Sequence, residues 1–210
     1  MLILFLIWVS GTVLARKKSC DVLSPTPGNP QTTTTDELAP PHSVVLLIDS
    51  ISHVLQCRIK IKEAPIRTTL NVRPSFKSLF VRPENRQYII RVNNSPKFKG
   101  IYNHEVPQPA LDGLWVHELM HIKDYQSRST FGILKRGAQY LTMKGRRMFE
   151  HEIDRMVVNE GYGEALYHWA NFIMYESWAS DRYKLYKQSV YLSPMQIKSA
   201  MNPNVFADAD

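Results

Sequence analysis

The chain has 210 residues, a formal net charge of +7 and a hydrophobic content of 44%. This length suffices for one domain of ordinary size with a sizeable core, which excludes a minimal scaffold. The positive charge permits attraction to anionic surfaces. The sequence contains no signature of a nucleic-acid-binding module, so we expect no nucleic-acid partner, and contact with an anionic membrane surface stays open.

Residues 1–15, MLILFLIWVSGTVLA, contain no charged side chain. A short apolar run that ends in Val13-Leu14-Ala15 is typical of a secretory signal peptide, with cleavage expected after Ala15. The run is shorter than the roughly 20 apolar residues that span a bilayer. We therefore predict an exported protein, periplasmic or secreted, with an N-terminal membrane anchor as the alternative.

Residues 16–42 are rich in Ser, Pro and Thr, a composition that predicts a disordered linker or a short pro-segment. One folded domain is expected over residues 43–210. The chain has two cysteines, Cys20 and Cys57. An exported protein could pair them, or both could stay reduced.

The domain is expected to begin with a helix over residues 43–55, because its apolar residues recur at helical spacing. Strict alternation at 57–62 then predicts a strand with one solvated face. Three further strands are predicted at 68–72, 78–81 and 86–93. Together they indicate an α+β fold with a small, mainly antiparallel sheet.

Residues 112–126, DGLWVHELMHIKDYQ, contain His117-Glu118-Leu119-Met120-His121, an H-E-x-x-H motif. On a helix the two histidines project from one face, at a separation that suits one tetrahedral zinc ion. Apolar residues surround the motif, and burial of unpaired imidazoles and a carboxylate is costly. The sequence therefore predicts one Zn²⁺ bound by His117 and His121, with Glu118 as the general base.

The segments that flank this helix have predicted roles of their own. The strand at 88–94 is a candidate edge strand that could hold a peptide substrate by strand addition, with an interior strand as the alternative. The loop at 95–111 is a candidate wall of the cleft, although surface roles are favoured for its Tyr102 and His104. The basic, aromatic segment at 128–143 is expected to pack on the domain rather than to contact a membrane.

Helical patterns dominate the C-terminal half. A helix is predicted over residues 144–160, with Gly161 placed as the residue that follows a helix end. A long aromatic-rich helical stretch is expected over 163–186. Ser193 and Pro194 predict the start of a short last helix.

Zinc in a hydrolase usually takes three protein ligands. Asp124 and Ser127 stand where a metzincin would have Gly and His, and Tyr140 and Leu141 stand where a thermolysin-like enzyme would have Glu. The next acidic cluster is Glu150-His151-Glu152-Ile153-Asp154. Glu150 and Asp154 share one helix face, so one could bind zinc while the other orients a ligand imidazole, and His151 is a possible substitute ligand.

The stretch Arg146-Arg147-Met148-Phe149-Glu150-His151-Glu152-Ile153-Asp154 resembles the R-x-F-E-x-x-A-D pattern of gluzincins similar to the CAAX prenyl protease and HtpX peptidases, with Ile153 in place of Ala. The resemblance covers about 40 residues and the order of the predicted elements. It implies that Glu150 is the third zinc ligand and that Asp154 lies behind the ligands and orients them. It further implies a minimal, soluble zincin-like fold in which the sheet packs on the H-E-x-x-H helix and a C-terminal helical half.

The reaction expected from these residues is hydrolysis of a peptide or protein substrate by a zinc-dependent endopeptidase. Zinc would lower the pKa of a bound water, and Glu118 would take its proton and pass it to the leaving amine. Tyr162, His168 and Arg155 are candidate donors to the developing oxyanion. The alternative is a zinc-binding protein of the same fold that acts as a binding or assembly factor without proteolysis.

Overall fold

The computed structural model describes residues 22–23, 45–46, 48–49 and 57–202. The predicted signal peptide at 1–15 and Cys20 lie outside these residues. Of the predicted linker at 16–42, only Val22 and Leu23 are described, and of the predicted first helix, residues 45–46 and 48–49 are helical. In the described part of the chain, no helix is both long enough and apolar enough to cross a membrane.

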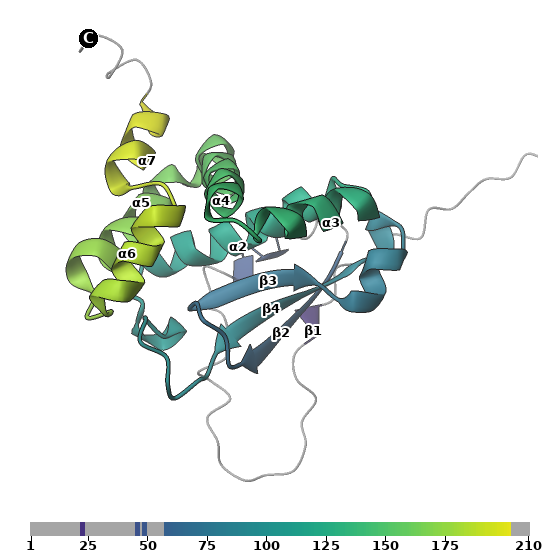
Figure 1. Ribbon diagram of the computed structural model, residues 1–210, viewed down its shortest axis with the longest axis horizontal. Coiled ribbons are helices and arrows are strands. Elements are labelled where there is room, and N and C mark those ends of the chain that lie inside the picture. Colours follow the sequence, from purple (N-terminus) through teal and green to yellow (C-terminus); the bar gives the residue numbers. More distant parts are fainter. Residues whose placement is uncertain (1–21, 24–44, 47, 50–56, 203–210) are drawn as a thin grey trace, which may run out of the picture.

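The fold is α+β, and its sheet has the strand order β1-β2-β4-β3 (Figure 1). The strands are β1 (Val22–Leu23), β2 (Arg58–Ala64), β3 (Leu70–Pro74) and β4 (Gln87–Asn93). β2 pairs in parallel with β1 and β4, whereas β3 and β4 are antiparallel. The predicted mainly antiparallel sheet is wrong: β4 enters between two strands of opposite direction, so it must be parallel to one of them.

β4 is an interior strand, which was the alternative to its candidate role as the edge strand beside the helix. Ile90 of β4 is fully buried and lies opposite Ile61 on one side and Val72 on the other. Both rows of main-chain groups of β4 are used within the sheet. β4 therefore cannot hold a peptide by strand addition.

The strand predicted at 78–81 is absent. A 3₁₀ helix, η2, spans Phe76–Phe80, and a second, η3, spans Pro83–Asn85. The hydroxyl groups of Ser75 and Ser78 are 2.7 Å apart, and the Ser78 hydroxyl accepts a hydrogen bond from the backbone N–H of Gln87. These side-chain hydrogen bonds offer the backbone an alternative to pairing with a neighbouring strand. The alternation of residue types in the sequence does not reveal them.

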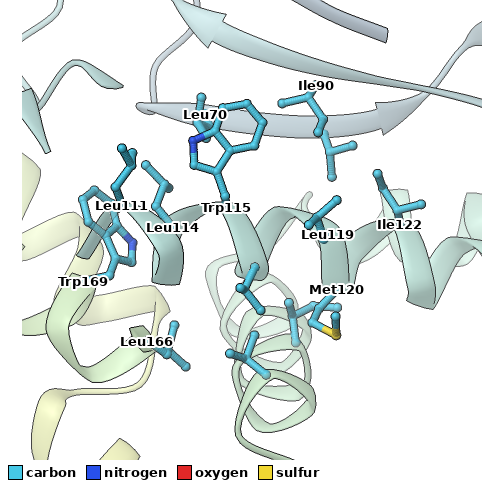
Figure 2. Packing of buried hydrophobic residues seen from close by; sticks show 14 of the residues in the cluster. Leu70, Ile90, Leu111, Leu114, Trp115, Leu119, Met120, Ile122, Leu166 and Trp169 are labelled. Atoms are coloured by element: carbon cyan, nitrogen blue, oxygen red, sulfur yellow. The ribbon is translucent and has the colours of Figure 1, made fainter. Parts of the chain in front are cut away.

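Helix α2 (Ala110–Gln126) is the centre of the core. In Figure 1 the sheet lies on one side of α2 and α4 lies on the other. Trp115 and Leu119 are fully buried, and Figure 2 shows them on the side that faces Leu70 and Ile90 of the sheet. Each such side chain contributes roughly 1.5–3 kcal/mol by burial, so the sheet holds α2 firmly in place.

The segments on either side of α2 pack by local contacts. In the loop before it, which contains η4 (Asn103–Glu105), the rings of Tyr102 and His104 stack with centroids 5.6 Å apart. Helix α3 (Thr130–Gln139) follows α2 and buries Ile133 and Arg136, while Phe131 stays exposed. The segment at 128–143 thus packs on the domain by one face.

The C-terminal half is helical, as predicted, but it is interrupted. Its elements are α4 (Met143–Val157), the π-helical turn η5 (Val158–Tyr162), α5 (Gly163–Asn171), the π-helical turn η6 (Phe172–Glu176), α6 (Asp181–Val190) and α7 (Pro194–Met201). Gly161 has φ 89°, a left-handed conformation that suits glycine where a helix ends. Ser193 caps α7 in a capping box with Gln196, as its sequence predicts.

The helical stretch predicted over 163–186 is mostly helical but is interrupted at 177–180. Ser177 is extended, and the hydroxyl of Ser180 accepts a hydrogen bond from the backbone N–H of Tyr183 to begin α6 as a separate helix. A serine followed by aspartate at 180–181 is an ordinary N-cap signal. The continuous aromatic content of this stretch concealed that signal.

Candidate metal centre

His117 and His121 project from α2 on the side away from the sheet. Each follows a sheet-facing residue, Trp115 or Leu119, by two positions, which is a rotation of about 200° around the helix. Their rings contact each other with centroids 4.9 Å apart, and their Nε2 atoms are 3.2 Å apart. The helix therefore presents two imidazole nitrogens to one point between α2 and α4.

Helix α4 brings Glu150 to the same point. Its Oε2 lies 3.2 Å from Nε2 of His117 and 3.1 Å from Nε2 of His121. All three side chains are buried, with Glu150 2% exposed. The cluster His117, His121 and Glu150 could hold a metal ion.

The spacing of these donor atoms fits a small metal ion. Zinc bonds of 2.0–2.1 Å to nitrogen and oxygen in a tetrahedral site place the ligand atoms about 3.3 Å from one another. The three atoms of the cluster are 3.1–3.2 Å apart. Two neutral imidazoles and one carboxylate also form a donor set common in catalytic zinc sites.

The two histidines differ in what holds their second ring nitrogen. Nδ1 of His117 donates to Oδ1 of Asp154 at 2.9 Å, since an ionised carboxylate can only accept. The buried Nδ1 of His121 has no hydrogen-bond partner in the described part of the chain. The His121 ring is instead held by packing, with the rings of Tyr125 and Phe149 at 6.0 and 5.1 Å.

The charges of the cluster stabilise one another. Burial lowers the pKa of His117, but hydrogen bonds to Asp154 and Glu150 and their negative charges outweigh burial and raise the pKa to about 10. Burial raises the pKa of Glu150, but the charges and hydrogen bonds of His121 and His117 bring it well below its usual range. Glu150 is therefore ionised at neutral pH and available as an anionic ligand.

Tyr140 completes the surroundings of Glu150. Its hydroxyl donates to Oε1 of Glu150, the carboxylate oxygen that does not face the histidines. Burial and the charge of Glu150 raise the pKa of Tyr140, so the hydroxyl keeps its proton. No local pattern in the sequence marks this role of Tyr140, because the contact depends on how α3 docks against α4.

Glu118 lies next to the cluster in sequence and is 6% exposed. Within the described residues its carboxylate takes part in no hydrogen bond and no ion pair. Burial of such a carboxylate is unfavourable by itself. The Glu118 carboxylate is therefore free to accept a proton beside the candidate ligands.

Tyr191, in the turn between α6 and α7, contacts the cluster from outside α2 and α4. Its ring centroid is 5.4 Å from that of His117. Burial and the charge of Glu150 raise the pKa of Tyr191 well above its usual value, so it is a neutral hydrogen-bond donor. No local pattern marks Tyr191, because the turn that carries it is brought to the cluster by the docking of α6 and α7.

A pocket opens beside His117 and Asp154, with about 560 Å³ of empty space, part of it open to solvent. Its far wall is apolar and comes from α5 and η6, including Leu166, Trp169 and Ile173. α6 contributes Lys187. His117, one of the three candidate metal ligands, therefore borders a space in which a small group could bind.

Three predicted oxyanion donors are not part of this site. Arg155 and His168 are exposed, and Tyr162 packs against the hydrophobic core. None of them has a hydrogen bond or ring contact to the cluster in the described part of the chain. Arg155 lies five residues beyond Glu150, about 140° around α4, which turns it towards solvent. His151, the possible substitute ligand, also lies outside the cluster.

An ion-pair network connects the helices behind the cluster. Asp124 of α2 accepts hydrogen bonds from Arg128 and from Arg136 of α3, and Arg136 also pairs with Glu152 of α4. Burial raises the pKa of Asp124, but its hydrogen bonds to the two arginines outweigh burial and lower it. The network fixes α2 relative to the helix that carries Glu150.

Comparison of the chain with protein-family models, curated proteins and solved structures found no match.

Proposed function

We propose that this protein is a zinc-dependent peptidase with His117, His121 and Glu150 as the metal ligands. The observation that carries the proposal is the triangle of buried donor atoms, 3.1–3.2 Å apart, on two packed helices. A second supporting feature is Asp154, which holds the other nitrogen of His117 in the way that carboxylates commonly orient zinc-bound imidazole.

Zinc fits these donors better than the common alternatives. Calcium and magnesium prefer oxygen ligands, whereas imidazole suits zinc and other transition metals. The absence of a thiolate or a thioether in the cluster argues against copper(I). When bound, zinc supplies Lewis acidity that lowers the pKa of water and polarises a carbonyl group.

The residues of the chain perform the remaining steps. The carboxylate of Glu118 takes a proton from the attacking water and delivers it to the leaving amine. Tyr191 donates a hydrogen bond to the carbonyl oxygen as negative charge develops on it, a role that its neutral hydroxyl beside His117 supports. Asp154 keeps the His117 ring in one orientation throughout.

The proposal includes the gluzincin identity of the fold. The H-E-x-x-H helix α2, the α4 helix with Glu150 and Asp154, and a sheet that packs on the opposite face of α2 are the parts that such an enzyme requires. We also propose that the protein is exported from the cytoplasm, as residues 1–15 predict.

The test uses the purified protein, its metal content and a mixed peptide library read by mass spectrometry. We expect one zinc per chain and cleavage that a chelator abolishes and zinc restores. Glu118→Gln keeps the size of the side chain and removes its basicity, so it should retain zinc and lose activity by about 10²–10⁴-fold. Glu164→Gln, at an exposed position of α5, is the matched control and should remain active. Stoichiometric zinc without cleavage of any peptide would instead favour a binding or assembly factor.

A further inference from the structure

Lys187 is a buried cation whose charge no described carboxylate neutralises. It is 6% exposed and is the sole lysine or arginine among the residues that line the pocket beside His117. In the described part of the chain its ammonium group makes no hydrogen bond and no ion pair. A buried charge of this kind is costly unless something stabilises it.

Three aromatic rings stabilise the charge of Lys187. Its Nζ lies 4.3 Å from the ring centroid of Tyr191, 5.6 Å from that of Tyr183 and 5.7 Å from that of Trp169. Cation–π contacts attract the ammonium group but accept none of its three N–H hydrogen bonds. The cage therefore holds a cation in place and leaves its donors available to a ligand.

The position of Lys187 relates it to the candidate metal centre. The Tyr191 ring contacts both, with its centroid 5.4 Å from that of the His117 ring and 4.3 Å from Nζ of Lys187. One residue of extended peptide spans about 3.3–3.6 Å. A group that reaches Lys187 from a substrate carbonyl at the cluster would belong to a residue close to the cleaved bond.

We propose that Lys187 binds a carboxylate of the substrate, and that the apolar wall formed by Leu166, Trp169 and Ile173 receives the apolar part of the same residue. This inference rests on the proposed peptidase function and names its substrate class. Asp154, the acidic residue in the pocket lining, does not compete, because it is bonded to His117 and to the backbone N–H of Leu192. The carboxylate has two sources: the C-terminus of a peptide or an acidic side chain.

The first experiment measures binding rather than turnover. The probes are 3-phenylpropanoate and its amide, which share an apolar ring and differ in the charged group. Calorimetry with the zinc-loaded protein should show about tenfold or tighter binding of the acid, in line with a charge-assisted hydrogen bond. Lys187→Met should lose this preference, and Lys187→Arg should keep most of it.

Two controls separate Lys187 from other causes. Lys198→Met removes a lysine that also lies 4.3 Å from a tyrosine ring centroid, that of Tyr167, but outside the pocket, and it should keep the preference. The second control repeats the measurement after chelation. If the metal alone held the carboxylate, chelation would weaken binding of the acid equally in the wild type and in Lys187→Met. If wild-type protein binds acid and amide equally, or if Lys187→Met retains the preference, the inference is wrong.

Peptide substrates then identify the source of the carboxylate. One pair of peptides differs by a free or amidated C-terminus, and the other by Glu or Gln beside the cleaved bond. A preference for the free C-terminus that depends on Lys187 indicates a carboxypeptidase, and one for Glu indicates an endopeptidase that selects acidic residues. Carboxylate binding through Lys187 without cleavage of any peptide would contradict the proposed function and leave the binding site standing.

Discussion

The carboxylate of Asp154 lies 2.9 Å from Nδ1 of His117, and this contact connects the candidate metal centre to the C-terminal helices. The second oxygen of the same carboxylate accepts a hydrogen bond of 2.9 Å from the backbone N–H of Leu192. One buried side chain therefore orients a ligand and positions the turn that carries Tyr191. Binding of metal and placement of the proposed oxyanion donor are coupled through Asp154.

Asp154→Asn should weaken zinc binding by about 10–100-fold, as is typical when the group that orients a ligand histidine is changed. His117 and Leu192 donate to different oxygens of Asp154, and in the amide one of these oxygens is replaced by an NH₂ donor, so the two hydrogen bonds cannot both persist. Competition with a chromogenic chelator measures the affinity. Asp181→Asn, the same substitution at an exposed position of α6, is the control and should leave the affinity unchanged. Equal affinity of the wild type and Asp154→Asn would contradict the orienting role.

Tyr140→Phe should reduce zinc affinity by about tenfold while the protein stays folded. The substitution keeps the ring that packs 5.6 Å from Phe149 and removes the donor to Oε1 of Glu150. A hydrogen bond to a charged group contributes about 1.5–3 kcal/mol, so the carboxylate becomes less well positioned. Tyr186→Phe removes a hydroxyl that is bonded to Arg146 instead and should behave as wild type. An unaltered zinc affinity in Tyr140→Phe would show that the contact is structural only.

Local patterns in the sequence predicted those parts of the site that lie on single helices. His117 and His121 share a face of α2 because of their spacing, and Glu150 and Asp154 share a face of α4 for the same reason. Tyr140, Tyr191 and Lys187 reach the site through the docking of α3, α6 and α7. Their side chains carry no periodic signal, so the sequence alone could not single them out.

The sheet shows the same limit. Alternation of residue types located β2 and β4 to within a residue or two, because the period of a strand is visible in its own residues. The order of the strands depends on pairing between residues far apart in the sequence, which local patterns do not show. In the structure β4 lies between β2 and β3. The 3₁₀ helix at Phe76–Phe80 was mistaken for a strand, since hydrogen bonds of Ser75 and Ser78 decide its conformation.

Zinc binding should release about one proton from His117 at pH 7. The pKa of about 10 without metal means that His117 is then protonated, and zinc requires the neutral ring. Because the pKa of His117 is higher in the folded state, its protonated ring stabilises the metal-free fold. This stabilisation is complete below the unfolded pKa of about 6.5 and is lost as the pH rises through about 10. Zinc affinity should accordingly rise about tenfold per pH unit between pH 7 and 8.5. Calorimetry in buffers of different ionisation enthalpy counts the protons, and no release at pH 7 would contradict the shift.

Tyr191→Phe should lower kcat by about a hundredfold and leave zinc affinity unchanged. Removal of one donor to a developing oxyanion typically has an effect of that order. The ring that packs against His117 and Lys187 is retained, so metal and carboxylate binding should persist. Peptide kinetics together with the chelator competition distinguish the two effects. A rise in KM without a change in kcat would point to substrate binding rather than to stabilisation of the transition state.

Gly113→Ala should destabilise the protein by about 1–3 kcal/mol or prevent folding, because a methyl group there overpacks the contact between α2 and α5. A Cβ at Gly113 would lie 2.0 Å from the backbone oxygen of Ala165, so two helix backbones would have to move apart. Gly137 in α3 is the matched control, since a Cβ there meets nothing within 4 Å. Gly137→Ala should stabilise by roughly 0.5–1 kcal/mol through helix propensity alone. Urea unfolding measures both changes in the free energy of unfolding. The opposite signs follow from the same added methyl group, so a loss of stability in both variants would contradict close packing of α2 on α5 as the cause.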